Sequence, residues 1–138
     1  MLMPCEIAVR CLVPVLRAAV VKALAKTHHL KQQEIAELLG ITQTAVSYYI
    51  RDIRGKAIEI EDERELMALT ENIAKMLTTG NFSPFEFRRR TCEACLKARE
   101  MGLMCNSHNQ LEHSAEFESC GFCTVKPEKS MVDNKPSG

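Results

Sequence analysis

The sequence lacks the features of membrane and secreted proteins. None of its apolar stretches approaches the roughly 18 to 20 residues that a membrane-spanning helix needs. No basic segment followed by an apolar stretch opens the chain, so we expect a cytoplasmic protein with no membrane partner. The 18 basic and 18 acidic residues cancel, so the net charge alone predicts no polyanionic partner.

The arrangements of residues that support catalysis are also missing. The sequence has no paired acid–base residues, no glycine-rich nucleotide-binding loop and no Ser-His-Asp set. A C-x-x-C oxidoreductase requires a βαβ context, whereas the apolar spacing in this chain is helical. We therefore expect an all-α protein that is not an enzyme.

Cysteine, by contrast, is abundant. The 138 residues include seven cysteines, and in a reducing compartment such a count points to metal or redox chemistry before disulfides. Five of them follow the spacing C-x2-C-x9-C-x14-C-x2-C in the last third of the chain: Cys92, Cys95, Cys105, Cys120 and Cys123. Cys5 and Cys11 stand apart near the start, and we expect them to be small buried hydrophobic residues.

The neutral net charge hides an uneven distribution of charged residues. Residues 1–58 carry 8 basic and 4 acidic side chains, which gives this segment a net charge of +4. Residues 59–82 carry 2 basic and 6 acidic side chains, which gives a net charge of −4. The basic first segment is therefore able to face phosphates, although the whole chain is neutral.

The basic segment has the pattern of a helix-turn-helix domain. Apolar residues at helical spacing predict a first helix over residues 13–26 and a second over residues 31–39. Gly40 follows where helices often end in a left-handed residue, and Thr42 is placed to cap a third helix over residues 43–51. The positions at which the three helices share a core are apolar: Ile35, Leu39, Ile41, Val46 and Tyr49. The alternative is a pair of ordinary packed helices joined at a glycine.

The third helix presents the residues that we expect to contact double-stranded DNA: Thr42, Gln43, Thr44, Ser47, Tyr48, Arg51 and Arg54. Gln43, Thr44 and Ser47 lie where side chains form hydrogen bonds to base edges in the major groove. Thr42 and the positive helix start suit a phosphate, as do the two arginines, which set affinity rather than sequence choice. The Tyr48 ring suits either role, or covers the surface.

A further amphipathic helix is predicted within residues 59–82. Leu66, Leu69, Ile73 and Leu77 recur at helical spacing and form one apolar face. We expect this face to form a homodimer, because a recognition helix usually needs a partner to read both half-sites of a palindromic operator. The alternative is that the face packs on its own domain.

The next helix leads into the cysteines. Ser83 and Glu86 form a capping box around Pro84, and Gly102 marks the end of the helix. The first two clustered cysteines are three residues apart on this helix, so their side chains share one face.

Two C-x-x-C pairs in one short segment indicate a metal site, because each pair lets two sulfurs reach one centre. The five candidate ligands exceed the four that an all-thiolate site needs, and His108 and His113 are substitute ligands. Three alternatives fit: an iron–sulfur cluster ([4Fe-4S] or [2Fe-2S]), a structural zinc ion, or a metal-free thiol switch.

Several stretches resemble one family of regulators. They are Met3-Pro4-Cys5-Glu6-Ile7, the recognition element from Ile41 to Tyr49, Cys92-Glu93-Ala94-Cys95, the stretch from Gly102 to His108, and Cys120-Gly121-Phe122-Cys123. In these stretches the chain is similar to archaeal transcriptional regulators that join an N-terminal helix-turn-helix to a cysteine-rich C-terminal segment. The resemblance spans most of residues 3–123. It implies a cytoplasmic DNA-binding regulator with an iron–sulfur cluster on the C-terminal cysteines.

The sequence thus predicts four parts. They are a helix-turn-helix domain over residues 1–58, an acidic connector and dimerisation helix over 59–82, a cysteine-rich metal segment over 83–125 and a disordered tail over 126–138. The predicted function is that of a homodimeric regulator whose cluster senses redox state or the supply of iron and sulfur. The alternative is a zinc-stapled helix-turn-helix regulator or adaptor protein without a redox-sensing role.

Overall fold

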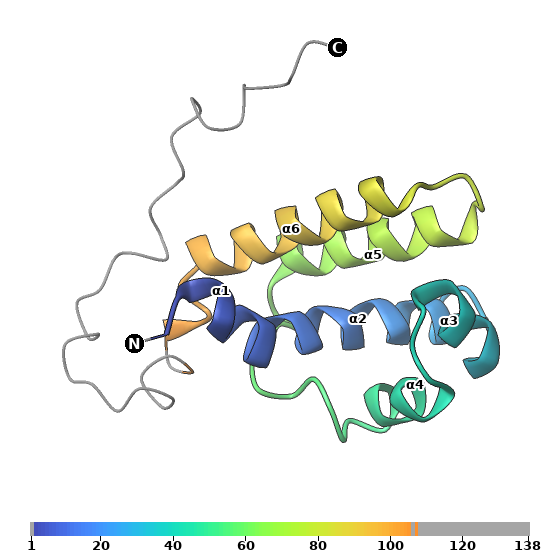
Figure 1. Ribbon diagram of the computed structural model, residues 1–138, viewed down its shortest axis with the longest axis horizontal. Coiled ribbons are helices and arrows are strands. Elements are labelled where there is room, and N and C mark those ends of the chain that lie inside the picture. Colours follow the sequence, from blue (N-terminus) through green and yellow to red (C-terminus); the bar gives the residue numbers. More distant parts are fainter. Residues whose placement is uncertain (1, 106, 108–138) are drawn as a thin grey trace, which may run out of the picture.

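The computed structural model describes residues 2–105 and 107, and all regular structure in this part of the chain is helical (Figure 1). The elements are α1 (Pro4–Ile7), the π-helical segment η1 (Ala8–Leu12), α2 (Val13–Lys26), α3 (Gln32–Leu39), α4 (Gln43–Ile50), α5 (Arg64–Thr78) and α6 (Pro84–Glu100). The predicted all-α fold is therefore confirmed. No helix in this part is long and apolar enough to cross a membrane. The predicted ligands Cys120 and Cys123, their substitutes His108 and His113, and the predicted tail over 126–138 lie outside the described residues.

The first helix begins earlier than its sequence pattern predicts. α1, η1 and α2 follow one another without a break, because the linking residues Ala8, Leu12 and Val13 all have right-handed helical angles. The widened turn comes directly before Pro14, where the Val13 N–H donates to the carbonyl of Ala8. Proline lacks an N–H, and its ring collides with the carbonyl four residues earlier in a regular helix, so a π turn accommodates it.

The helices α5 and α6 lie side by side along α2, while α3 and α4 pack at the C-terminal end of α2 (Figure 1). Two groups of buried residues hold this arrangement together. The helix-turn-helix cluster contains Ala18, Val20, Val21, Leu24, Ile35, Ala36, Val46, Tyr49, Ile73, Ala74 and Leu77. The cysteine-end cluster contains Ile7, Ala8, Leu12, Val15, Leu16, Ile60, Leu66, Ala94, Ala98 and Met104. Both α2 and α5 contribute buried residues to both clusters, so the two ends of the fold share these two helices.

The apolar face of α5 is buried within the chain itself, which corrects the prediction that it forms a dimer surface. Leu66, Ile73 and Leu77 are at most 2% exposed, and Leu69 is half-buried against the cysteine-end cluster. The physical reason is that α2 and α6 both need apolar cover, and α5 packs on both of them. The alternative weighed from the sequence, packing on its own domain, is the observed one.

The loop between α4 and α5 passes very close to α2 at Gly55. This residue has φ +77°, and a Cβ atom there would lie 2.6 Å from the Cβ of Ala18 and 2.6 Å from the carbonyl oxygen of Pro14. Only glycine fits this approach without strain. The loop then buries Ile60 in the cysteine-end cluster.

Candidate functional site

The turn between α3 and α4 has the geometry that the sequence predicts. Gly40 ends α3 with φ +65°, and the Ile41 N–H donates to the carbonyl of Ala36 at 3.1 Å. The Thr42 hydroxyl then accepts a hydrogen bond from the Ala45 N–H at 3.1 Å and caps α4. Glycine supplies the left-handed residue and threonine the cap, so the sequence itself encodes this turn.

The expected core of the helix-turn-helix is also confirmed. Ile35, Val46 and Tyr49 are buried, and Leu39 and Ile41 are partly buried against them. Both α3 and α4 pack on α2, so three helices hold the turn in place. α4 is therefore held at an angle fixed by its core, as a recognition helix must be.

The outward face of α4 brings the predicted DNA contacts together. Most of them are exposed: Thr42, Gln43, Thr44, Arg51 and Arg54, with Ser47 and Tyr48 half-buried between them. The Ser47 hydroxyl accepts a hydrogen bond from Nε of Arg51 at 3.1 Å. The guanidinium groups of Arg51 and Arg54 lie 5.6 and 5.3 Å from the centre of the Tyr48 ring. Such cation–π contacts hold both arginines on the same surface as the exposed start of α4.

An ion pair that the sequence reasoning missed anchors the end of α4. Asp52 has φ +59° and accepts a hydrogen bond from Nζ of Lys22 on α2. This bond and the charges of nearby lysines lower the pKa of Asp52, against a smaller opposing effect of desolvation. The lysine lies 30 residues away in sequence, so no local pattern reveals the pair.

The first two cysteines are not the buried hydrophobic residues that we expected. Cys5 is exposed and Cys11 is half-buried. The buried face of α1 and η1 instead carries Ile7, Ala8 and Leu12, which pack in the same cluster as Ala94 and Ala98 of α6. Cys5 lies beside this face and keeps its thiol accessible to solvent.

Three of the predicted metal ligands lie in the described residues, on α6 and just beyond it. Cys92 is exposed, whereas Cys95 and Cys105 are half-buried. Cys95 packs against the cysteine-end cluster, and Cys105 follows Met104, which is fully buried in that cluster. No group of three or more Cys, His, Asp and Glu side chains in residues 2–105 and 107 is already arranged to hold a metal ion. A metal site on these thiols therefore needs further ligands or a rearrangement.

The surroundings of Cys95 combine thiols with a cation. Burial raises the pKa of the Cys95 thiol, the charge of Arg99 opposes this rise, and the thiols of Cys92 and Cys5 add to it. Nε of Arg99 is buried and has no hydrogen-bond partner among the described residues. An unsatisfied buried donor is costly, and an anionic thiolate or cluster beside it would supply the missing acceptor.

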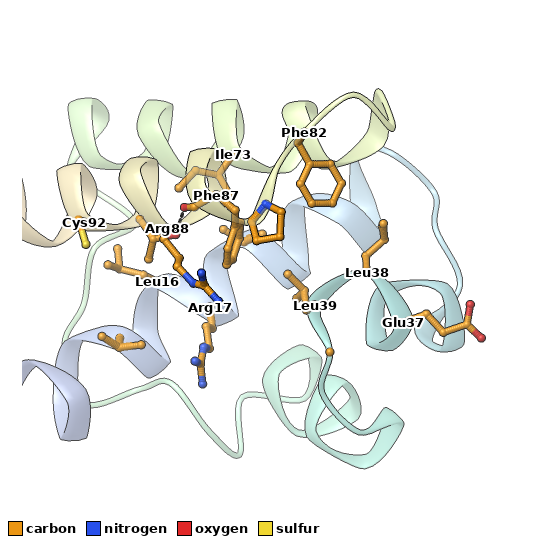
Figure 2. A pocket seen from close by; sticks show the side chains of 15 residues that line it. Leu16, Arg17, Glu37, Leu38, Leu39, Ile73, Phe82, Phe87, Arg88 and Cys92 are labelled. Carbon is orange, nitrogen blue, oxygen red and sulfur yellow. Dashed lines mark hydrogen bonds between the residues drawn. The ribbon is translucent and has the colours of Figure 1, made fainter. Parts of the chain in front are cut away.

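A cleft lies between α6 and the helix-turn-helix (Figure 2). Its volume is about 520 Å³, and α2, α3, α6 and the loop before α6 line it. Phe82 and Phe87 cover its α6 side, Leu38 and Leu39 border it on α3, and Cys92 lines it further along α6. The apolar pattern of the sequence did not reveal this cleft, because its walls come from segments that are distant in the chain.

Comparison with known proteins identifies one part of the chain. Residues 21–60 match the helix-turn-helix family. No curated protein and no solved structure matches the chain. The matched range contains the end of α2, all of α3 and α4, and the loop that follows. Residues 21–60 are thus a helix-turn-helix domain of the kind found in DNA-binding regulators.

Proposed function

We propose that this protein is a sequence-specific transcriptional regulator whose cysteines bind an iron–sulfur cluster that senses redox state or the supply of iron and sulfur. One observation carries the proposal: α6 links the thiols to the helix-turn-helix. Its first half packs on the helix-turn-helix cluster through Phe87, and its second half carries Cys92 and Cys95. A structural change at the thiols can therefore reach the DNA-binding domain through α6.

The DNA-binding half of the proposal rests on the exposed face of α4. Gln43, Thr44 and Ser47 contact base edges, with the glutamine able to pair with adenine through two hydrogen bonds. The cap residue Thr42 and the N-terminus of α4 bind a phosphate. Arg51 and Arg54, held beside Tyr48, bind neighbouring phosphates and set the salt dependence of binding.

The metal-binding half rests on the chemistry of the donor set. An all-thiolate site would take four ligands from the five candidates Cys92, Cys95, Cys105, Cys120 and Cys123. Burial raises the pKa of the Cys95 thiol, the charge of Arg99 opposes this rise, and the unpartnered Nε of Arg99 suits a neighbouring group that carries negative charge. An iron–sulfur cluster, when bound, supplies one-electron redox chemistry. A zinc ion on the same thiols would instead only stabilise the fold.

The cleft is the route by which the metal site acts on DNA binding. Phe87 on one wall and Leu39 on the other belong to the same apolar packing around the helix-turn-helix cluster. A shift of α6 on loss of the cluster changes this packing and so the position of α3 against α4. Packed cores move between discrete arrangements rather than deforming continuously, so a small shift alters the fit to DNA.

We also propose that the regulator binds a palindromic operator as a homodimer. Two recognition helices reading two half-sites give the specificity that one short helix lacks. The α5 face is not available for this contact, but α6 leaves Phe85 and Leu96 exposed. These residues are eleven apart, or about three helical turns, and so lie on one side of α6. Light scattering during size-exclusion chromatography tests the dimer.

The decisive experiment compares protein with and without its metal. The full chain is purified without oxygen, analysed for iron, zinc and acid-labile sulfide, and used to select a duplex from random-sequence DNA. Its affinity for that duplex is then measured by fluorescence anisotropy before and after metal removal. We expect broad visible absorption, iron with sulfide, and at least a tenfold difference in affinity, about 1.4 kcal/mol.

Each part of the proposal has its own contrary outcome. Equal affinity in the two states would exclude the switch. Colourless protein with stoichiometric zinc would support the zinc-stapled alternative. Two variants test whether DNA binding depends on α4. Gln43→Ala removes a proposed base contact, whereas Lys75→Ala removes a positive charge from the exposed surface of α5, far from α4 in the sequence. Normal DNA binding by Gln43→Ala would favour the adaptor function instead.

A further inference from the structure

We infer that the cleft between α6 and the helix-turn-helix binds a small molecule that has an apolar body and a carboxylate at one end. Arg17 and Arg88 hold the carboxylate, and the apolar walls of the cleft hold the body. This site goes beyond the proposed function, which assigns no small-molecule ligand to the protein. It is built from described residues alone and does not depend on the metal site.

The cleft has the size and the lining of a ligand pocket. Its volume of about 520 Å³ lies within the range of roughly 300–1,000 Å³ that is usual for small-molecule sites. Leu16 and Val20 line it from α2 and are buried, at 1% and 5% exposed. Leu38, Phe82 and Phe87 line the other walls and are only partly buried. These three side chains lose contact with water when an apolar group enters, and this loss favours binding.

Two arginines from different helices give one end of the cleft a positive charge. Arg17 on α2 and Arg88 on α6 both line the cleft and are exposed. Figure 2 shows the two side chains near each other at one end of the cleft. Glu37 is the only acidic side chain among the described residues that line the cleft, and it lies at the opposite end (Figure 2). An anionic group is therefore attracted to the arginine end.

Neither arginine forms an ion pair within residues 2–105 and 107. The next two residues of α6 differ in this respect, because Arg89 and Arg90 both pair with Glu86. A guanidinium group fits a carboxylate through two parallel hydrogen bonds, so each unpaired arginine offers a suitable donor set. The two positive charges also repel each other, and an anion bound between them removes this repulsion.

A molecule in the cleft contacts both α6 and the helix-turn-helix. Leu38 and Leu39 on α3 form one wall, and Phe87 on α6 forms another. The ligand therefore favours the spacing between the two walls that fits it best, and a preference for one spacing shifts the affinity for DNA. This effect on DNA rests on the proposed regulator function, whereas binding of the ligand does not.

The first test measures the binding of octanoate to the full chain, purified without oxygen, by isothermal titration calorimetry. Octanol and octyltrimethylammonium are the matched ligands, because they carry the same alkyl chain with a neutral and a positively charged end. We expect octanoate to bind at least roughly tenfold more tightly than either, because hydrogen bonds to a charged group add to the burial of the chain. No binding of octanoate, or equal affinity for all three, would overturn the inference.

The second test compares Arg17→Gln and Arg88→Gln with Arg89→Gln. Arg89 is the matched control, because it is exposed on the same helix as Arg88 but does not line the cleft. We expect the first two variants to bind octanoate at least roughly tenfold more weakly and Arg89→Gln to match the wild type. Unchanged binding of octanol verifies that the cleft stays intact. Full octanoate affinity in both cleft variants would mean that the carboxylate binds elsewhere, and the inference would be wrong.

Other occupants of the cleft give different results. If the two arginines contact DNA phosphates instead, replacing them weakens binding to all duplexes and leaves the octanoate affinity unchanged. If a second copy of the chain fills the cleft, octanoate converts a dimer into a monomer in light scattering. Either result would overturn the inference.

The effect on DNA binding is judged separately. The affinity for the selected duplex is measured by anisotropy with and without saturating octanoate, and the octanoate affinity with and without duplex should change by the same factor. No change would exclude a regulatory role for the ligand and leave its site in place. A protein that binds octanoate but no duplex would contradict the proposed function and not this inference.

Discussion

The helix-turn-helix cluster and the cysteine-end cluster occupy the two ends of α2 and differ in how far apart their residues lie in the sequence. Apart from Ile73, Ala74 and Leu77 on α5, the first draws its buried residues from Ala18 to Tyr49, a short contiguous stretch. The second joins the start of the chain at Ile7 to Met104. A cluster of local contacts forms readily and leaves a clear sequence pattern, whereas a cluster that joins distant segments forms only when the whole chain folds.

The largest expected effect comes from emptying the helix-turn-helix cluster. Ile35 is fully buried, so Ile35→Ala should lower the free energy of unfolding by about 2–5 kcal/mol. Met104→Ala, in the cysteine-end cluster, should cost an amount in the same range. Since α2 and α5 run through both clusters, we expect each variant to unfold in a single transition.

Two probes distinguish the ends during urea unfolding. The chain has no tryptophan, and its only two tyrosines, Tyr48 and Tyr49, both lie on α4, so tyrosine fluorescence reports on the helix-turn-helix end. Alkylation of the half-buried Cys95 reports on the other end. Separate midpoints for the two probes would show that the clusters are independent units.

The next effect concerns the loop that lies against α2 between the clusters. Gly55→Ala should destabilise the protein by about 1–2 kcal/mol for its positive φ, with an added cost of about 1–3 kcal/mol for the collision with Ala18. Gly80→Ala is the matched control, because Gly80 has φ +71° but open space around its Cβ position. Chemical denaturation measures the free energy of unfolding of both variants. Equal losses of stability would mean that the loop shifts away from α2 without cost.

The sequence predicted most of the helix-turn-helix end because its signals are local. Gly40, Thr42 and the apolar spacing around Ile35 each act within a few residues, and the structure confirms all three. The same holds for the start of α6, where the Ser83 hydroxyl accepts a hydrogen bond from the Glu86 N–H.

The cysteine end was less predictable because its defining contacts are between distant segments. Composition alone gave no sign that Ile7 and Met104, which lie 97 positions apart in the chain, share one buried cluster. The apolar face of α5 was equally ambiguous, since a helix face that covers its own core and one that covers a partner have the same periodicity. The metal ligands Cys92, Cys95 and Cys105 remain predictions.

A smaller effect separates base recognition from phosphate binding at α4. Gln43→Ala should weaken binding to the selected duplex by about 1–3 kcal/mol and relax the preference at one base position. Arg51→Ala should weaken binding to all duplexes and reduce the slope of log affinity against log salt by about 1. Anisotropy titrations over a series of salt concentrations measure both. A sequence-specific loss in Arg51→Ala would reverse the two roles.

The smallest effect lies at the start of α6, near the helix-turn-helix end. Glu86 accepts hydrogen bonds from Arg89 and Arg90, which lower its pKa from 4.5 to about 2. Because this folded-state pKa lies below the unfolded value, the stabilisation is present above pH 4.5 and is lost as the pH falls towards 2. The free energy of unfolding of the wild type should therefore exceed that of Glu86→Gln at pH 7, and this difference should shrink between pH 5 and pH 3, as measured by urea denaturation.

Glu37→Gln is the control, because Glu37 is exposed on α3 and forms no ion pair within the described part of the chain. A difference that stays constant with pH for Glu86→Gln would mean that solvent screens these ion pairs within α6 completely.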